Sequence, residues 1–352
     1  MRRRPEEPEA DLLRRAAAAP DFPAGAGLDA ESLAQVAKRH GLDFATALLY
    51  QRLRASPRHG PLIARLETPP TPGQILNAHV LIVPGAFYRE KPETGADGRF
   101  VREAAAQLGC ATEMVPLQSF GSLEDNAALL AARLACADEE PLILVSLSKG
   151  AAEVRQLLAR PDAAELFRPV VAWVDLSGLF LGTPLVGWLR AHRLRLLLLR
   201  LLFWLKGYSY ARLRALDRDA CPPWPEALAA VPHVKVVHVV GLPLRRHLTT
   251  ALARRGHRRL APQGPSDGTI LLGDVWHLPG LVFPVWGADH YLCPQGRDMR
   301  SLVVRVLQYL AEELAPANVV DGGRWMVDGE GKQAPSGPST IHRPPSTTKE
   351  AR

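Results

Sequence analysis

One serine of the sequence stands where nucleophilic chemistry is feasible. Residues 142–147 (LILVSL) form an apolar run typical of a buried strand, and Ser148-Lys149-Gly150 and a helical pattern follow directly. A serine on a sharp strand-to-helix turn holds its hydroxyl above the sheet, and this turn needs small neighbours. The next backbone N–H then lies at a helix N-terminus, where an oxyanion is favoured. Gly150 meets the steric requirement, whereas Ser146 stands where glycine is usual, and the pattern alone also fits a serine that caps a helix.

Two loops further along the chain carry residues that could activate this serine. A serine hydroxyl needs a base, and the base needs a carboxylate that orients it. The segment 281–290 is an apolar run that ends in Gly-Ala-Asp-His, and it puts His290 in a loop after a late strand. The turn-rich segment 264–269 carries Asp267. We therefore expect Ser148 as the nucleophile, His290 as the base and Asp267 as the acid that orients the base.

Other residues compete for the two supporting roles. His257 and His277 are alternative bases, although His277 could equally be a core or turn histidine. Asp175, at the end of an expected strand, and Asp274 are alternative acids. Asp289 is expected to shape its loop rather than to orient the ring, because adjacent side chains seldom face each other.

Short apolar runs alternate with amphipathic stretches from residue 76 onward. The runs that we expect to be strands are 79–83, 110–115, 142–147, 170–176, 234–240 and 281–286. Helical patterns lie near 100–108, at 122–137, after Ser148 and at 298–314. This alternation is typical of βαβ units, so we expect an α/β fold with a mostly parallel central sheet flanked by helices.

Composition divides the chain into three parts. We expect an N-terminal helical extension at 1–75, a main domain at 76–320 and a disordered tail at 321–352 that is rich in Gly, Pro, Ser and Thr. Within the extension, residues 1–27 are expected to be loosely ordered, and 68–75 is a proline-rich linker. Helices are expected over 28–67, with Asp29 and Asp43 as N-caps.

An insertion at 177–230 interrupts the alternation and is expected to form a helical cap. Its segment 189–206 is rich in Leu and studded with Arg, which is too much charge for a good membrane span. One interpretation is a cap helix packed over the main sheet. The other is a lid that touches lipid, with Phe203, Trp204 and the leucines inserted and the arginines meeting headgroups.

The overall charge and the cysteines limit the remaining function classes. The formal net charge of +7 suggests affinity for anionic surfaces without choosing among nucleic acid, membrane and acidic ligands. An arginine cluster at 245–259 is either a solvated face or a dock for phosphate, and no nucleic-acid module is recognisable. The four cysteines, Cys110, Cys136, Cys221 and Cys293, show no metal-ligand spacing. We expect free thiols, no metal or cofactor, and a cytoplasmic protein without a secretory signal, with pairing of the thiols left open.

Together these motifs resemble the α/β-hydrolase fold family of the lipase/esterase type, over about residues 76–315. The resemblance rests on Ser146-Leu147-Ser148-Lys149-Gly150 as nucleophile elbow, Ser266-Asp267-Gly268 as acid loop, Gly287-Ala288-Asp289-His290 as histidine loop and Val83-Pro84-Gly85-Ala86-Phe87 after the first strand. It implies an oxyanion hole made by the amides of Ala86 and Lys149, with Phe87 beside the substrate. Pro84 stands where His is common in such enzymes. We expect the Lys149 ammonium itself to be solvated on the surface.

The resemblance implies a serine hydrolase that cleaves a carboxylic ester through an acyl-enzyme. Its substrate would be a small-molecule or lipid ester, with peripheral contact to an anionic membrane as a further expectation and no nucleic acid. An acyltransferase or a thioesterase on the same three residues is an alternative, and so is a noncatalytic binding protein that kept the fold.

Overall fold

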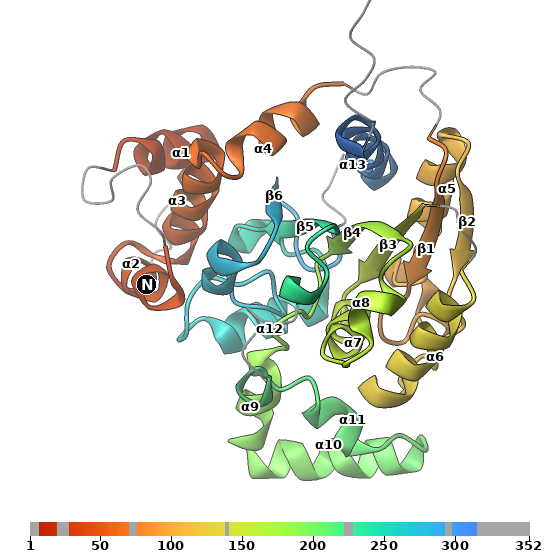
Figure 1. Ribbon diagram of the computed structural model, residues 1–352. Coiled ribbons are helices and arrows are strands. Elements are labelled where there is room, and N and C mark those ends of the chain that lie inside the picture. The colour runs from red at the N-terminus through yellow and green to blue at the C-terminus, as the bar shows by residue number, and fades with distance from the viewer. Residues whose placement is uncertain are drawn as a thin grey trace, which may run out of the picture. The chain divides into compact units, whose positions relative to one another are not determined.

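The computed structural model describes residues 7–19, 28–69, 76–137, 141–221, 228–292 and 298–314 (Figure 1). The expected disorder of the tail and most of the expected linker at 68–75 lie outside these residues, as does Cys293.

A six-stranded sheet forms the centre of the described fold, with the strand order β2-β1-β3-β4-β5-β6. All neighbouring strands pair in parallel. The strands are β1 (His79–Val83), β2 (Ala111–Met114), β3 (Leu142–Leu147), β4 (Val170–Leu176), β5 (Lys235–Leu242) and β6 (Leu281–Trp286). Every residue of β3 is buried, because helices cover both faces of a parallel sheet and its central strands need apolar side chains on both sides. The expectation of an α/β fold with a mostly parallel sheet is confirmed.

The direction of winding changes between β1 and β3. The chain runs from β1 to β2 toward one edge of the sheet, but from β3 to β4 toward the other edge. The loops after β1 and β3 therefore leave the sheet in opposite directions, and ligands of such sheets bind in the crevice between these loops. Residues 84–87 and Ser148 follow these two strands directly.

Helices lie on both faces of the sheet (Figure 1). On one face α5 (Arg99–Gln107) packs against α13 (Met299–Leu314), and on the other α6 (Leu123–Ala135), α7 (Lys149–Leu158) and α8 (Ala163–Leu166) pack together. Helix α12 (Ala251–Leu260) follows β5. Short 3-10 turns occupy Pro92–Thr94, Arg218–Ala220, Leu228–Ala230, Arg245–His247 and Leu272–His277.

Among the described residues, four helices precede the sheet: α1 (Glu9–Ala17), α2 (Ala30–His40), α3 (Leu42–Ala55) and α4 (Gly60–Glu67). Helices α3 and α4 contact β6, the edge strand. An edge strand presents unpaired backbone groups that can recruit another chain, and covering it removes that hazard.

Helix α1 lies within the stretch that composition marks as loosely ordered, so that expectation is wrong for residues 9–17. Leu12 and Ala16 are buried in this helix, which packs against α3. The Glu9 carboxylate also accepts a hydrogen bond from Trp286 Nε1 at the end of β6, at 3.0 Å. These partners are remote in sequence, which is why local composition does not reveal the helix.

The two expected N-caps have different outcomes. Asp29 caps α2 by accepting the Ser32 N–H at 2.7 Å. Asp43 does not cap α3, because Gly41 occupies that position. The Asp43 carboxylate instead accepts the backbone N–H of Arg245 at 2.9 Å and joins the N-terminal helices to the segment after β5.

His59 supplies an acceptor to the edge strand. Its Nδ1 accepts the backbone N–H of Val282 in β6 at 3.2 Å, and the residue is only 1% exposed. Burial lowers the pKa of His59 to about 4, so its ring stays neutral and keeps this lone pair.

Stability is therefore expected to depend on pH through His59. Between pH 6.5 and 4 the unfolded state binds a proton that the folded ring does not, so the free energy of unfolding should fall by up to ~3 kcal/mol as the pH drops through this window. His59→Gln, which retains an acceptor but does not titrate, should flatten this part of the profile in urea unfolding. The exposed His40→Gln serves as the control, and an unchanged profile in His59→Gln would contradict the assignment.

The insertion between β4 and β5, which we expect to be a cap, contains α9 (Pro184–Arg190), α10 (Arg193–Leu205) and α11 (Tyr210–Arg214). The Arg190 guanidinium pairs with the buried Asp217 carboxylate at 2.7 Å. The Thr183 hydroxyl donates to the carbonyl of Thr269 at 2.6 Å. Most leucines of α10 are exposed, so they do not pack over the sheet. Among the described residues, no helix has both the length and the apolar content to cross a bilayer.

Candidate active site

Ser148 lies in a strained turn between β3 and α7. Its φ of 47° is positive, which is costly for a residue other than glycine and persists only where neighbouring contacts impose it. The Ser148 N–H donates to the carbonyl of Leu176 at 3.1 Å, and its carbonyl accepts the N–H of Leu179 at 2.8 Å. A Cβ on Gly150 would lie 2.6 Å from the carbonyl oxygen of Val83, so only glycine lets α7 approach β1 this closely.

Ser146, the departure from the usual glycine, belongs to a buried hydrogen-bond network in the sheet. Its hydroxyl donates to Asp175 Oδ1 at 3.1 Å and accepts from Trp173 Nε1 at 2.9 Å. The second oxygen of Asp175 pairs with Nδ1 of the fully buried His238 at 2.9 Å. Ser146 thus satisfies two polar groups of β4 rather than lining the turn itself.

Ser146→Gly, although it introduces the usual residue, is expected to destabilise the fold by ~1–3 kcal/mol, because Trp173 Nε1 and Asp175 Oδ1 lose a partner inside the sheet. Urea unfolding measures this loss. Ser146→Ala separates the lost hydroxyl from the added backbone freedom of glycine. A gain in stability in Ser146→Gly would contradict the network's role.

His290 and Asp267 continue a chain of hydrogen bonds from Ser148. The Ser148 hydroxyl lies 3.0 Å from His290 Nε2, and His290 Nδ1 lies 2.9 Å from Asp267 Oδ2. The backbone N–H of His290 also donates to the carbonyl of Asp267 at 2.9 Å, which fixes one loop against the other. The structure thus brings together the three residues named from the sequence. In this geometry a histidine can take the serine proton while the carboxylate stabilises the imidazolium.

Asp267 is held firmly in this position. The carboxylate is fully buried, and its Oδ1 accepts the backbone N–H groups of Thr269 and Ile270, both at 2.7 Å. Only Oδ2 is left to face the histidine, so the loop fixes both the position and the orientation of the acid.

The neighbours of His290 support its loop. Asp289 accepts the Thr249 N–H at 2.8 Å and the Thr249 hydroxyl at 2.7 Å, and it has no bond to the His290 ring. Burial, together with the charges of Asp289 and Asp267, raises the pKa of Tyr291 to about 12. The Tyr291 phenol therefore stays neutral beside the histidine throughout the pH range of an ester assay.

Two backbone amides near Ser148 remain available to a ligand. Within the described part of the chain, neither the Ala86 N–H nor the Lys149 N–H donates to another group. The adjacent amides are engaged: Gly85 N–H donates to Ala96 and Phe87 N–H to Ser119, at 2.9 and 3.0 Å. Lys149 N–H belongs to the first residue of α7, where the helix dipole favours negative charge. Free amides on both loops of the crevice can stabilise an oxyanion.

The side chain of Lys149 is buried, so the expectation of a solvated surface lysine is wrong. It is 1% exposed and pairs with the equally buried Glu153 one turn along α7. Glu153 also accepts from Asn126 Nδ2 of α6 at 2.5 Å. Burial raises the pKa of Glu153, and the Lys149 ammonium and the Asn126 amide oppose that shift. The ammonium therefore serves the packing of α7 against α6.

The competing acids and bases have other partners. Asp175 pairs with His238, as described above, and Asp274 forms a two-pronged ion pair with Arg218 at 2.6 and 2.8 Å. His257 Nδ1 lies 3.0 Å from the carbonyl oxygen of Ser266. Within the described part of the chain, no hydrogen bond of His257, Asp175 or Asp274 reaches Ser148 or His290.

Aromatic side chains connect the loop after β1 to the insertion between β4 and β5. Phe87 stacks on Phe120 with ring centroids 4.6 Å apart, and Phe203 of α10 contacts Phe120 edge-on at 5.5 Å. Tyr208 joins both rings and donates to Glu90 at 3.3 Å. Phe203 is buried in this cluster, so it is not free to insert into lipid, whereas Trp204 is exposed. Phe120 and Tyr208 were not identified from the sequence, because no local motif marks them.

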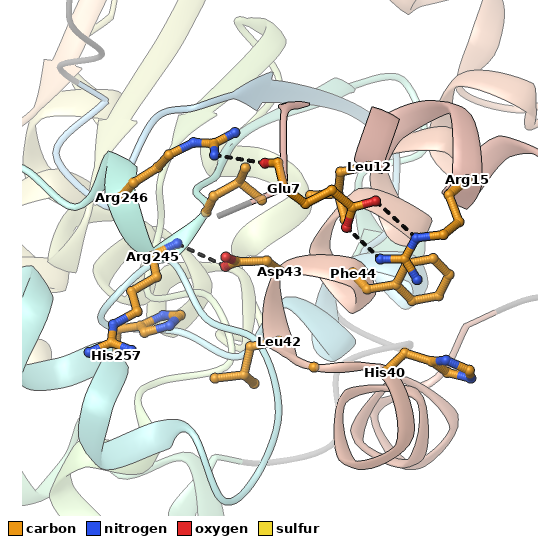
Figure 2. A pocket seen from close by; sticks show the side chains of 12 residues that line it. Glu7, Leu12, Arg15, His40, Leu42, Asp43, Phe44, Arg245, Arg246 and His257 are labelled. Atoms are coloured by element: carbon orange, nitrogen blue, oxygen red, sulfur yellow. Dashed lines mark hydrogen bonds and ion pairs between the residues drawn. The ribbon is translucent and has the colours of Figure 1, made fainter. Parts of the chain in front are cut away.

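The Glu9 carboxylate pairs at 3.1 Å with Arg246 of the arginine cluster at 245–259. A cavity of about 360 Å³ lies between the N-terminal helices and this cluster. Figure 2 shows its lining side chains, with Arg246 near Glu7 and Arg245 near Asp43. Arg246 donates to the carbonyl of Glu7 at 3.1 Å. The lining residues of this cavity do not include Ser148, Asp267 or His290, so it is separate from the site after β3. No group of His, Cys, Asp and Glu among the described residues could hold a metal ion.

No protein-family model matches the sequence, and no curated protein matches it. The structure is similar to that of the metagenomic carboxyl esterase MGS0156, with a TM-score of 0.54 and 19% identity over 88% of this chain and 100% of that chain. The chain has the α/β-hydrolase fold. It also matches the mature form of Bacillus licheniformis lipase BlEst2, with a TM-score of 0.48 and 18% identity over 70% of this chain and 96% of that chain.

Proposed function

We propose that the chain is a serine hydrolase that cleaves a carboxylic ester, with Ser148 as nucleophile, His290 as general base and Asp267 as the acid that orients the base. The observation that carries this proposal is the unbroken path from the Ser148 hydroxyl through both nitrogens of His290 to Asp267, with distances of 3.0 and 2.9 Å. The carboxyl esterase named above has a similar structure and adds weight to the ester as substrate class.

The proposed reaction has two stages. His290 Nε2 takes the proton of Ser148 as Oγ attacks the ester carbonyl, and the amides of Ala86 and Lys149 hold the oxyanion of the tetrahedral intermediate. Collapse transfers the proton from His290 to the departing alkoxide and leaves an acyl-enzyme. Water, deprotonated by His290, then releases the carboxylate and regenerates Ser148. We assign residues 177–230 as the cap of this domain, with Phe87 and Phe203 at the border of the acyl site.

Labelling with a fluorophosphonate tests the proposed nucleophile. The wild-type chain should form one adduct, located on the peptide that contains Ser148, and Ser148→Ala should form none. Ser177→Ala is the matched control, because Ser177 is also buried and has a positive φ of 48° but has no histidine partner among the described residues. A folded wild-type chain that stays unlabelled, or equal labelling of Ser148→Ala, would exclude the proposal.

A further inference from the structure

Helix α10 presents an unusually apolar surface. Its exposed residues include Leu194, Leu197, Leu198, Leu201, Leu202, Trp204 and Leu205, with exposed fractions from 46% at Leu202 to 78% at Leu194. At 3.6 residues per turn, positions 194, 198, 201 and 205 follow one line along the helix and form the centre of this face. Figure 1 shows α10 at the border of the fold, with α9 and α11 between it and the remaining helices.

The charged side chains of the segment that contains this face are all positive. Residues 184–216 contain no Asp or Glu, but they carry Arg190, Arg193, Arg195, Arg200, Lys206, Arg212 and Arg214. On the helix, Arg193 and Arg200 lie on one flank of the leucine face, and Arg195 and Lys206 lie on the other. A long cationic side chain on such a flank can bury its stem beside apolar groups and hold its charge at a headgroup.

The opposite side of α10 faces the active-site loops. Phe203 is the buried residue of the helix and contacts Phe120, which stacks on Phe87. Phe87 follows Ala86, one of the two proposed oxyanion donors. The leucine face therefore belongs to a helix that is anchored beside the crevice, and a surface bound there would lie close to the site.

We propose that the outward face of α10 is a docking surface for anionic phospholipid bilayers. The 13-residue helix is ~20 Å long, shorter than the ~30 Å hydrocarbon core, so it lies in the plane of the interface with its leucines among the acyl chains. Trp204 sits at the headgroup level, where amphipathic rings are favoured. Arginines on both flanks, with no acidic neighbour in the segment, match the charge of an anionic headgroup layer and select it over a neutral one.

Vesicle co-sedimentation tests this docking surface on the full chain. The wild-type protein should bind vesicles of phosphatidylcholine with phosphatidylglycerol more tightly than vesicles of phosphatidylcholine alone, and added salt should weaken the binding. Leu198→Asp/Leu201→Asp should lower the ratio of bound to free protein by ~10-fold or more, because two residues at the centre of the apolar face become charged. Leu129→Asp/Leu252→Asp is the control, since it changes two exposed leucines elsewhere and alters the net charge equally.

The outcomes separate docking from chemistry. Hydrolysis of a water-soluble p-nitrophenyl ester should be the same in the two double variants, so lost binding with retained hydrolysis supports the proposal. Equal binding of both double variants would overturn it, as would a wild-type protein that stays in the supernatant. Sedimentation velocity without lipid tests whether a second copy of the chain binds this face instead. A wild-type dimer that dissociates in Leu198→Asp/Leu201→Asp would assign the face to that second copy.

Discussion

Asp267→Asn is expected to lower kcat for ester hydrolysis by ~10⁴-fold with little change in KM. The reason lies in the two backbone N–H groups that Asp267 Oδ1 accepts. The amide oxygen of Asn must take this place, so its NH₂ group faces His290 Nδ1 and donates to it. The ring proton is then forced onto Nε2, the nitrogen that must receive the proton of Ser148. The steady-state rate of p-nitrophenyl ester hydrolysis measures this loss of kcat.

The acids that compete with Asp267 supply the controls. Asp274→Asn removes a carboxylate that pairs with Arg218 and should leave kcat unchanged. Asp175→Asn alters the network with His238 and should reduce stability rather than kcat of the folded protein. If Asp175→Asn or Asp274→Asn lowered kcat as much as Asp267→Asn, the proposed acid would be incorrect.

The fold could be predicted from the sequence because its signal is local. Most strands of the sheet are short apolar runs, although the edge strand β2 has the sequence Ala-Thr-Glu-Met. A parallel sheet covered on both faces requires apolar runs in β3 and β4. Helix α1 was missed for the opposite reason. Its composition is charged and rich in alanine, and what fixes it is a partner such as Trp286, 277 residues away.

The three residues of the candidate site could be predicted because they follow one another along the chain in the order that the fold requires. The order of Ser148, Asp267 and His290 along the chain follows from the connectivity of the sheet, and the structure brings these residues within hydrogen-bonding distance. The sequence alone does not show which amides are free or which acids and cations contact one another in the folded chain. Lys149 is the instructive error, because a lysine after a turn is usually solvated, and its burial depends on Glu153 and on Asn126 from α6.

Lys149→Met is expected to reduce the free energy of unfolding by ~3–5 kcal/mol, because it leaves the Glu153 carboxylate buried without its cation. Glu153 must then either stay charged in an apolar surrounding or bind a proton, and burial already raises its pKa. The loss should therefore be larger at high pH, where the uncompensated carboxylate is ionised, than at low pH. Urea unfolding across this pH range measures both the loss and its slope.

Lys149→Met/Glu153→Gln distinguishes the lost pair from lost packing. The glutamine keeps an oxygen that can accept from Asn126 Nδ2 but removes the buried charge, so most of the lost stability should return and its pH dependence should vanish. The double variant also separates the backbone N–H of residue 149 from the lysine side chain, because methionine keeps the N–H and lacks the ammonium. If that amide is what the residue supplies to the oxyanion, kcat of the folded double variant should remain near the wild-type value. A large loss of kcat at restored stability would instead assign the ammonium a part in the reaction that its burial against Glu153 does not suggest.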